Sequence, residues 1–228
     1  MLMKKFVLRD RPMTISVDRL FKQLHMDFNQ DDEDVQRVQS MLEEALAIAN
    51  PKAVYGIAAI EEKGEDYIVA GGVKIPSLLV RKNVEQVGRI FPFVATCGTE
   101  VEDWSKEFSD VLEQYWADTI KTLLLMEIRS ALSDIVKQTY VPDANLSVMS
   151  PGSLKEWPLP QQATLFHLIG SVTEDTGVTL TESFLMLPSK SVSGFFFSNQ
   201  GTYENCQLCP ILRCPGRRAP YQPDSIRL

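Results

Sequence analysis

Three cysteines near the carboxyl end of the chain have a spacing that suits metal binding. The segment CQLCPILRCP places Cys206, Cys209 and Cys214 in a C-x2-C-x4-C pattern. Two thiolates two residues apart can ligate one metal centre from a single tight turn, and a third can close one face of it. Cys97 is the remaining cysteine of the chain, so a four-thiolate site requires it as the distant ligand. This donor set suits an iron–sulfur (4Fe–4S) cluster, abbreviated Fe-S, or a four-cysteine zinc (Zn) site.

Other interpretations of this segment remain open. Three thiolates with an exchangeable fourth position would also form a metal site. The tail cysteines could instead be reduced thiols without a metal, and Cys97 could be a buried apolar side chain. From Cys206 onward four arginines, among them Arg213, Arg217 and Arg218, stand against one aspartate, a net charge of +3. These cations would offset the charge of a thiolate-bound cluster, or form a solvated tail or a docking patch for an acidic partner.

Composition and charge exclude several classes of protein. The 228 residues are 44% hydrophobic and 23% charged, which predicts one globular domain or one domain with a tail. The net charge of −7 argues against a nucleic-acid-binding protein, because phosphate contacts need clustered Lys and Arg. A membrane span is not expected, because no apolar run reaches roughly 18 residues. The start MLMKKFVLRDRP returns to charge at Arg9 before a signal-peptide core can form, so we expect a cytoplasmic protein.

Apolar periodicity and turn residues predict a mixture of helices and strands. We expect helices over residues 18–26, 35–50, 99–138 and 161–175, with a break in the third near Ser109 and Asp110. Strands are expected over residues 53–62, 66–76 and 89–98, and residues 178–187 and 191–199 should form a hairpin. This order predicts an α+β fold with a mostly antiparallel sheet. Residues 1–98 form an N-terminal α/β part of the same unit, residues 99–200 its core, and residues 201–228 a Cys/Arg/Pro-rich tail.

The segment TGVTLTESFLMLPSKSVSGFFFSN, over residues 176–199, resembles a known family. It is similar to the activation (reactivation) domain of cobalamin-dependent methionine synthase, above all at its LTESF and SVSG runs. The helix that ends in MEIRSAL and the Pro-Gly pair of MSPGS also lie where that family has a long helix and a ligand-binding loop. The resemblance covers roughly residues 110–198, and stand-alone homologues with a C-terminal cysteine motif are a still closer match.

The resemblance implies a fold, a ligand and a partner. The family domain is a C-shaped α+β unit with a bent, mostly antiparallel sheet and flanking helices. It binds S-adenosylmethionine (SAM) and presents the methyl group to oxidised cobalamin on a neighbouring corrinoid protein. Carried over to this chain, Pro151 and Gly152 form the loop that faces SAM, and the turn with Ser191, Ser193 and Gly194 borders the groove. Two further residues are implied as binding residues, namely Tyr203, in place of a tyrosine pair, and Glu127, in place of a helix carboxylate.

Two departures from the family pattern keep a second function open. Val148 stands where the family has an arginine, and Ser153 stands where it has a tyrosine. A guanidinium on the SAM carboxylate would be worth about 1.5–3 kcal/mol. The first hypothesis is therefore a protein that binds SAM and reactivates or services a corrinoid methyltransferase, and it would be an enzyme only if SAM binding is retained. The alternatives are a non-enzymatic Fe-S or zinc electron-transfer or interaction module for a corrinoid protein, and an unrelated zinc-stabilised interaction domain.

Overall fold

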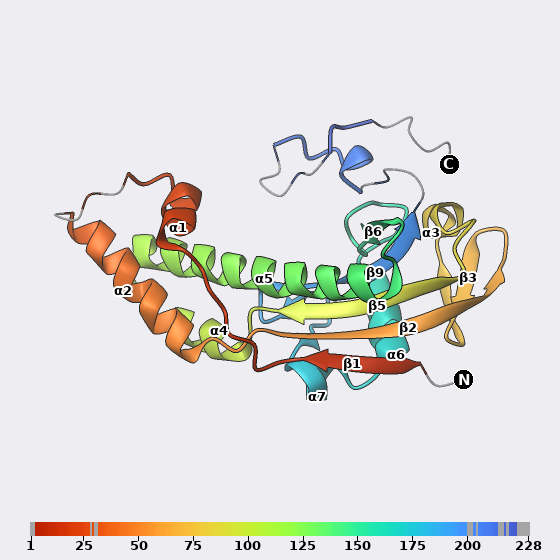
Figure 1. Ribbon diagram of the computed structural model, residues 1–228, viewed down its shortest axis with the longest axis horizontal. Helices are drawn as coiled ribbons and strands as arrows, with labels where there is room; N and C mark the ends of the chain where they lie inside the picture. The colour runs from red at the N-terminus through yellow and green to blue at the C-terminus, as the bar shows by residue number, and fades with distance from the viewer. Residues whose placement is uncertain are drawn as a thin grey trace.

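An antiparallel sheet runs through the middle of the molecule (Figure 1). The computed structural model describes residues 3–27, 29, 32–199, 203, 205–213, 217 and 219–222. Within them, seven strands form one sheet in the order β4-β3-β2-β5-β9-β6, with β1 beside β2. Their bounds are β1 Lys4–Leu8, β2 Lys52–Lys63, β3 Tyr67–Ala70, β4 Val73–Pro76, β5 Arg89–Thr96, β6 Asn145–Met149 and β9 Ser191–Asn199.

The run of three phenylalanines in β9 shows why this strand lies inside the sheet. Side chains alternate between the two faces of a strand, so Phe195 and Phe197 share one face and Phe196 takes the other. Each of the three is at most 2% exposed, and burying a Phe side chain stabilises the fold by about 1.5–3 kcal/mol. Both faces of the sheet are therefore covered at this point, which explains an apolar run without alternation.

Helices cover both faces of the sheet and form a separate bundle at one end. Their bounds are α1 Val17–Leu24, α2 Glu33–Ile48, α3 Leu78–Asn83, α4 Thr99–Ser105, α5 Val111–Tyr140, α6 Gln161–Ile169 and α7 Val172–Thr176. The predicted break before the long helix is confirmed. Asp110 caps α5 by accepting hydrogen bonds from the backbone N–H groups of Leu112 and Glu113, at 2.8 and 3.1 Å.

The long helix α5 joins two hydrophobic cores. Its carboxyl-terminal half packs Ile128, Leu132 and Val136 onto the sheet, against a cluster that includes Phe196 of β9. Its amino-terminal half leaves the sheet and meets α1, α2 and α4 (Figure 1). On the opposite face of the sheet, α3 and α6 cover a cluster that contains Phe195, Phe197 and Trp157.

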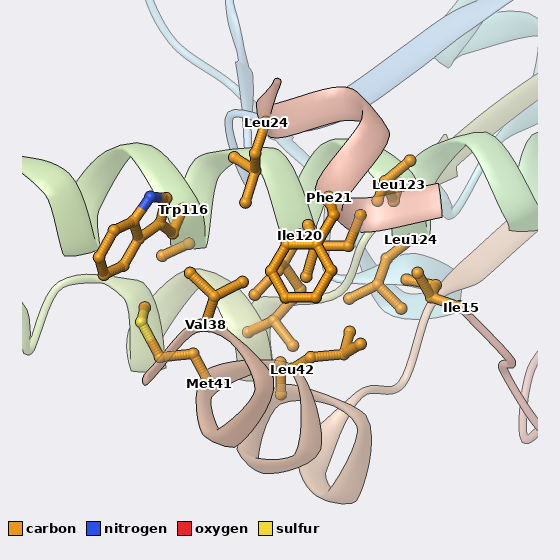
Figure 2. Close-up of a cluster of buried hydrophobic side chains, with 14 of the residues drawn as sticks. Ile15, Phe21, Leu24, Val38, Met41, Leu42, Trp116, Ile120, Leu123 and Leu124 are labelled. Atoms are coloured by element: carbon orange, nitrogen blue, oxygen red, sulfur yellow. The ribbon is translucent and has the colours of Figure 1, made fainter. Parts of the chain in front are cut away.

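Figure 2 shows the helical core that closes the far end of the molecule. Buried side chains of α1, α2 and α5 point toward one another there, and those labelled include Phe21, Leu24, Val38, Met41, Leu42, Trp116, Ile120, Leu123 and Leu124. In α2 the buried apolar positions follow the spacing of three and four residues that predicts an amphipathic helix. This core fixes α5, whose other half lies beside the candidate site.

The structure confirms the α+β fold with an antiparallel sheet, but the predicted hairpin over residues 178–199 is wrong. The short strands β7 Thr179–Leu180 and β8 Met186–Leu187 pair with each other, and β9 pairs with β5 and β6. Thr181 causes the difference, because its hydroxyl accepts a hydrogen bond from the N–H of Leu185 at 3.0 Å and closes a turn inside the predicted strand.

Among the described residues, no helix combines the length and the apolar character that a membrane crossing requires.

Candidate functional site

The Pro151 and Gly152 loop begins where the edge strand β6 ends. Met149 is the last residue of β6 and pairs with Phe195 of β9. Gly152 has a φ of +80°, and a Cβ atom there would lie 2.8 Å from Leu159 Cδ1. The Gly152 N–H donates to the Trp157 carbonyl oxygen at 2.8 Å. Glycine at this position therefore holds the loop in a left-handed conformation that brings backbone to the surface beside β6.

Of the three predicted residues of β9, Gly194 packs directly against the start of this loop. A Cβ atom on Gly194 would lie 2.3 Å from the Met149 carbonyl oxygen and 2.8 Å from Ser150 Oγ. Ser193 is 2% exposed, and its hydroxyl has no hydrogen-bond partner among the described residues. Ser191 Oγ lies 2.9 Å from Thr96 Oγ1 and 2.8 Å from the Pro188 carbonyl oxygen, so it fixes the start of β9. Gly194 thus supports the loop by close packing, and Ser191 does not reach it.

A cleft of about 530 Å³ separates this loop from the cysteine tail. We call it the tail cleft. One wall is the loop, and the other is the chain around Cys209 together with Tyr221. The lining residues are Gly152, Ser153, Leu154, Lys155, Glu156, Leu208, Cys209, Pro210, Ile211 and Tyr221. The structure therefore brings one predicted SAM-loop residue and one predicted metal ligand to the same cavity.

Arg217 holds the tail wall of this cleft in place. Its guanidinium donates to the carbonyl oxygens of Cys206, Cys209, Ile211 and Ala219, at 2.6 to 2.9 Å. A planar cation with several fixed donors suits such a set of acceptors, so one side chain organises the turn that carries two of the cysteines.

Tyr203 anchors the beginning of the tail. The Tyr203 carbonyl oxygen accepts a hydrogen bond from Ser147 Oγ at 2.9 Å, and its ring lies 6.2 Å from the ring of Phe197. The ring also packs against the cluster under α6. Tyr203 is therefore a contact between the tail and the sheet, and it is not among the residues that line the tail cleft.

A second, smaller groove of about 240 Å³ lies on the other side of β6, facing α5. We call it the α5 groove, and it is lined by Met126, Arg129, Ser130, Ser133, Leu146, Val148 and Phe196. Val148, the residue at the position of the family arginine, is part of its wall. Glu127 points elsewhere, because its carboxylate pairs with Arg19 of α1. The structure therefore does not bring Glu127 to either cavity, and it places the neighbouring Met126 there.

Cys97 is separated from the described cysteines of the tail. It is fully buried and belongs to the helical core, whereas Cys209 packs against the cluster under α6. Burial, and then the charge of Glu102, raise the pKa of the Cys97 thiol to about 12, although Lys121 acts in the opposite direction. A neutral buried thiol is a poor metal ligand, so this arrangement speaks against Cys97 as the fourth ligand.

The other cysteine predictions rest on the tail alone. Cys206 lies in the short 3-10 helix Asn205–Gln207, and both it and Cys209 are half-buried. Cys214 lies outside the described residues. Within the described ranges, no group of three or more His, Cys, Asp or Glu side chains is arranged to hold a metal ion. The metal site therefore stays a prediction.

A buried ion pair ties the family-like motif to the helices. Lys121 Nζ of α5 lies 3.0 Å from Glu102 Oε2 of α4 and 2.9 Å from Ser105 Oγ. Ser189 Oγ donates to the same carboxylate at 3.1 Å. Burial alone would raise the pKa of Glu102, but the bonds and charge of Lys121, with help from Ser189, bring it below its ordinary value. Part of the motif over residues 178–198 therefore serves to hold the fold.

Comparisons with known proteins agree with this architecture. The family model described as "Vitamin B12 dependent methionine synthase, activation domain" matches residues 158–207, which include β9. The resemblance to the methionine synthase activation domain is confirmed. A crystal structure of the MetH reactivation domain bound to AdoHcy matches with a TM-score of 0.60 and 18% sequence identity, over 88% of this chain and 80% of that chain. At this identity the match establishes a shared fold. A search of curated proteins found no match.

Several features of the site were not predicted from the sequence. Arg129 shares a groove with residues of β6 and β9, which are distant in the sequence, and the carbonyl groups that Arg217 bonds lie within 11 residues of it in the tail. The position of Cys209 opposite Gly152 was likewise not visible in the spacing of the motif. The Arg-rich composition of the tail indicated positive charge near the cysteines, but it did not show which carbonyl oxygens would accept hydrogen bonds from that charge.

Proposed function

We propose that this activation-domain-like protein binds SAM beside the Pro151 and Gly152 loop, and that it reactivates or services a partner corrinoid methyltransferase. The tail cleft carries the proposal, because its volume of about 530 Å³ lies within the usual range for small-molecule sites. The fold match to a domain whose crystal structure holds AdoHcy supports the ligand class. The family match over residues 158–207 supports the corrinoid partner.

The residues around the cleft suit a nucleoside ligand. Gly152 has no side chain of its own, is exposed and lines the cleft, so a ligand can approach its backbone closely. Tyr221, on the opposite wall and 43% exposed, offers an aromatic face on which a base can stack. When bound, SAM would supply the methyl group for the cobalt of the partner. The protein's own residues would position it and exclude water from one side.

The proposed function uses the three parts of the chain differently. Residues 1–98 supply five strands of the sheet, and residues 99–200 supply α5, the loop and β9. The described residues of the tail form one wall of the cleft. We propose that the first two parts together form the scaffold, and that the tail shapes access to the ligand.

Calorimetric titration with SAM and AdoHcy tests the ligand. The unmodified protein should bind both, and Gly152→Ala should bind roughly 10-fold more weakly, because the added Cβ would lie 2.8 Å from Leu159 Cδ1, so that the Leu159 side chain or the loop has to shift. Gly72→Ala is the matched control. Gly72 has the same φ of +80°, but nothing lies within 4 Å of its Cβ position, so binding should be unchanged. No heat from the unmodified protein with millimolar ligand would reject the proposal.

A metal-binding module is the second candidate, and two half-buried cysteines, one of which lines the cleft, favour it. Cys206 and Cys209 lie within one short turn, and Cys209 lines the cleft where a partner's cofactor would approach. Metal and acid-labile sulfide should be measured after anaerobic purification, with Cys209→Ser alongside. Iron with matching sulfide that is lost in Cys209→Ser would support an electron-transfer centre. Zinc alone would support a structural clamp, and the absence of both would reject this candidate.

A further inference from the structure

Two groups of apolar side chains stand out on the surface of the molecule. Among the described residues, the three most exposed large apolar side chains are Val111, Leu212 and Ile211, at 75%, 64% and 63%. Val111 begins α5, and the other two lie in the tail. Single exposed apolar side chains are ordinary, but contiguous ones with a charged rim mark interaction surfaces. Each of these two places has both properties.

The first group lies on the first turns of α5, and we call it the bundle patch. It consists of Val111, Leu112 and Tyr115, all of them exposed. Helix residues three and four apart share one face, so Tyr115 adjoins the other two. The face of α5 that packs in the helical core carries Trp116 and Ile120 instead. The bundle patch is therefore apolar surface that the helical core does not use.

The rim of the bundle patch is acidic. Asp110 directly precedes the patch, and Glu107 lies in the short connection between α4 and α5; both are exposed. Gln114 Nε2 donates to the Phe108 carbonyl oxygen at 2.9 Å, which holds this connection beside the first turns of α5. Neither carboxylate has an ion-pair partner among the described residues. Both are therefore available to a cation from outside the chain.

The second group, which we call the tail patch, is apolar and basic. It consists of Ile211, Leu212 and the exposed Arg213. Arg217 donates to the Ile211 carbonyl oxygen at 2.8 Å and so fixes the backbone of the patch. Within the described ranges, the Arg213 guanidinium has no ion-pair partner. The chain from Cys206 onward carries a net charge of +3, which leaves −10 on the first 205 residues. The tail patch thus complements the bundle patch in charge as well as in apolar surface.

We infer that two copies of this chain form a two-fold dimer, in which the tail patch of each copy packs on the bundle patch of the other. A second copy is the one occupant that covers both patches, and it sets Arg213 of one copy against Glu107 of the other. Within one chain the patches lie apart, because α5 begins at the helical end of the molecule and the tail lies beside the sheet (Figure 1). A contact between two different patches closes when it is made twice about a two-fold axis. This inference goes beyond the proposed function and does not depend on it.

Sedimentation velocity with a pair of charge reversals tests the contact. The unmodified protein, studied from roughly 5 to 500 µM, should pass from monomer to dimer and form no larger species. Arg213→Glu and Glu107→Arg each place like charges at both contacts of the dimer, so each variant alone should dimerise roughly 10- to 100-fold more weakly. A mixture of the two variants should dimerise as the unmodified protein does, because one copy of each brings opposite charges together at both contacts.

Two serine substitutions test the apolar part of the contact. Val111→Ser and Leu212→Ser remove an exposed side chain from opposite patches, and each should weaken dimerisation roughly 10- to 100-fold. Leu185→Ser is the matched control, since Leu185 is 55% exposed, lies between β7 and β8 and belongs to neither patch; its dimerisation should be unchanged. Arg11→Glu, which reverses an exposed charge outside both patches, is the control for charge.

Three results would each overturn the inference. The first is a monomer throughout the concentration range, and the second is a mass that keeps rising into larger species, which would indicate open head-to-tail chains. The third is a mixture of Arg213→Glu and Glu107→Arg that stays as weakly associated as either variant alone. Circular dichroism of every variant shows that it is folded, and because the substitutions lie on two separate patches, misfolding of one variant leaves the others as tests.

Discussion

Replacing Gly194 with alanine tests whether the loop beside β6 depends on close packing against β9. A Cβ atom at this position would lie 2.3 Å from the Met149 carbonyl oxygen and 2.8 Å from Ser150 Oγ. The first contact is to backbone, so it cannot be relieved by rotating a side chain. Because Cβ atoms essentially never come within 3.0 Å of such a neighbour, the end of β6 has to move away from β9.

The size of the effect follows from this movement. Overpacking of a well-packed interior costs about 1–3 kcal/mol. For a protein of this length, that corresponds to a melting temperature lower by roughly 2–12 °C. The displaced segment leads directly into Pro151 and Gly152, so Gly194→Ala should also weaken the binding of AdoHcy.

Gly88→Ala is the matched comparison for this experiment. Nothing lies within 4 Å of a Cβ atom at Gly88, and its φ is not in the left-handed range. The free energy of unfolding of this variant should lie within about 0.5 kcal/mol of that of the unmodified protein or slightly above it. Urea unfolding of both variants, followed by circular dichroism, gives the difference in free energy. If Gly194→Ala is as stable as Gly88→Ala and binds AdoHcy normally, the reasoning about close packing is refuted.

Three further predictions concern the ion pair, the buried thiol and the tail. Lys121→Met should lower the free energy of unfolding by about 3 kcal/mol at pH 7, because it leaves the Glu102 carboxylate buried without its partner. The pKa of Glu102 is lowered in the folded protein, so the ion pair stabilises the fold above the ordinary pKa of 4.5, and this stabilisation is lost as the pH falls through the folded-state pKa. Urea unfolding at pH 3 should therefore show a smaller difference in free energy between variant and parent than at pH 7. An equal difference at both pH values would contradict this. Iodoacetamide at pH 8 should modify Cys206 and Cys209 in the folded protein and spare Cys97, whose pKa is about 12. Mass spectrometry shows the order in which the cysteines are modified, and early modification of Cys97 would count against its burial. Arg217→Lys should speed amide hydrogen exchange around Cys206 and Cys209, because an ammonium group cannot donate hydrogen bonds to all the carbonyl oxygens that accept them from the guanidinium. Unchanged exchange there would show that other contacts hold the tail.

The sequence predicted the parts of the fold that depend on local patterns. The helix break at Asp110 could be predicted because an N-cap residue is recognised from its own type and the residues next to it in the sequence. Gly177 was correctly expected to end a helix, and it has a left-handed φ of 77°. The predicted helix over residues 161–175 nevertheless divides at Gly170, which has a φ of 67° and separates α6 from α7. An isolated glycine in an apolar helical pattern leaves both outcomes open.

Long-range pairing was the part that local patterns could not supply. β9 was expected beside the segment before it, but its partners are β5 and β6, which lie about 95 and 46 residues earlier as measured from Thr96↔Ser191 and Met149↔Phe195. The same limit applies to the site. Glu127 was assigned by its place in a resembling helix, whereas its contact with Arg19 depends on how α1 packs on α5.

Hydrogen–deuterium exchange with and without AdoHcy is the most direct test of the central claim, that a SAM-type ligand binds beside the Pro151 and Gly152 loop. Ligand should slow exchange in residues 146–156 and at the facing wall around Cys209, and leave α2, in the helical core, unchanged. Slower exchange confined to another part of the molecule, or no change at saturating ligand, would contradict the account.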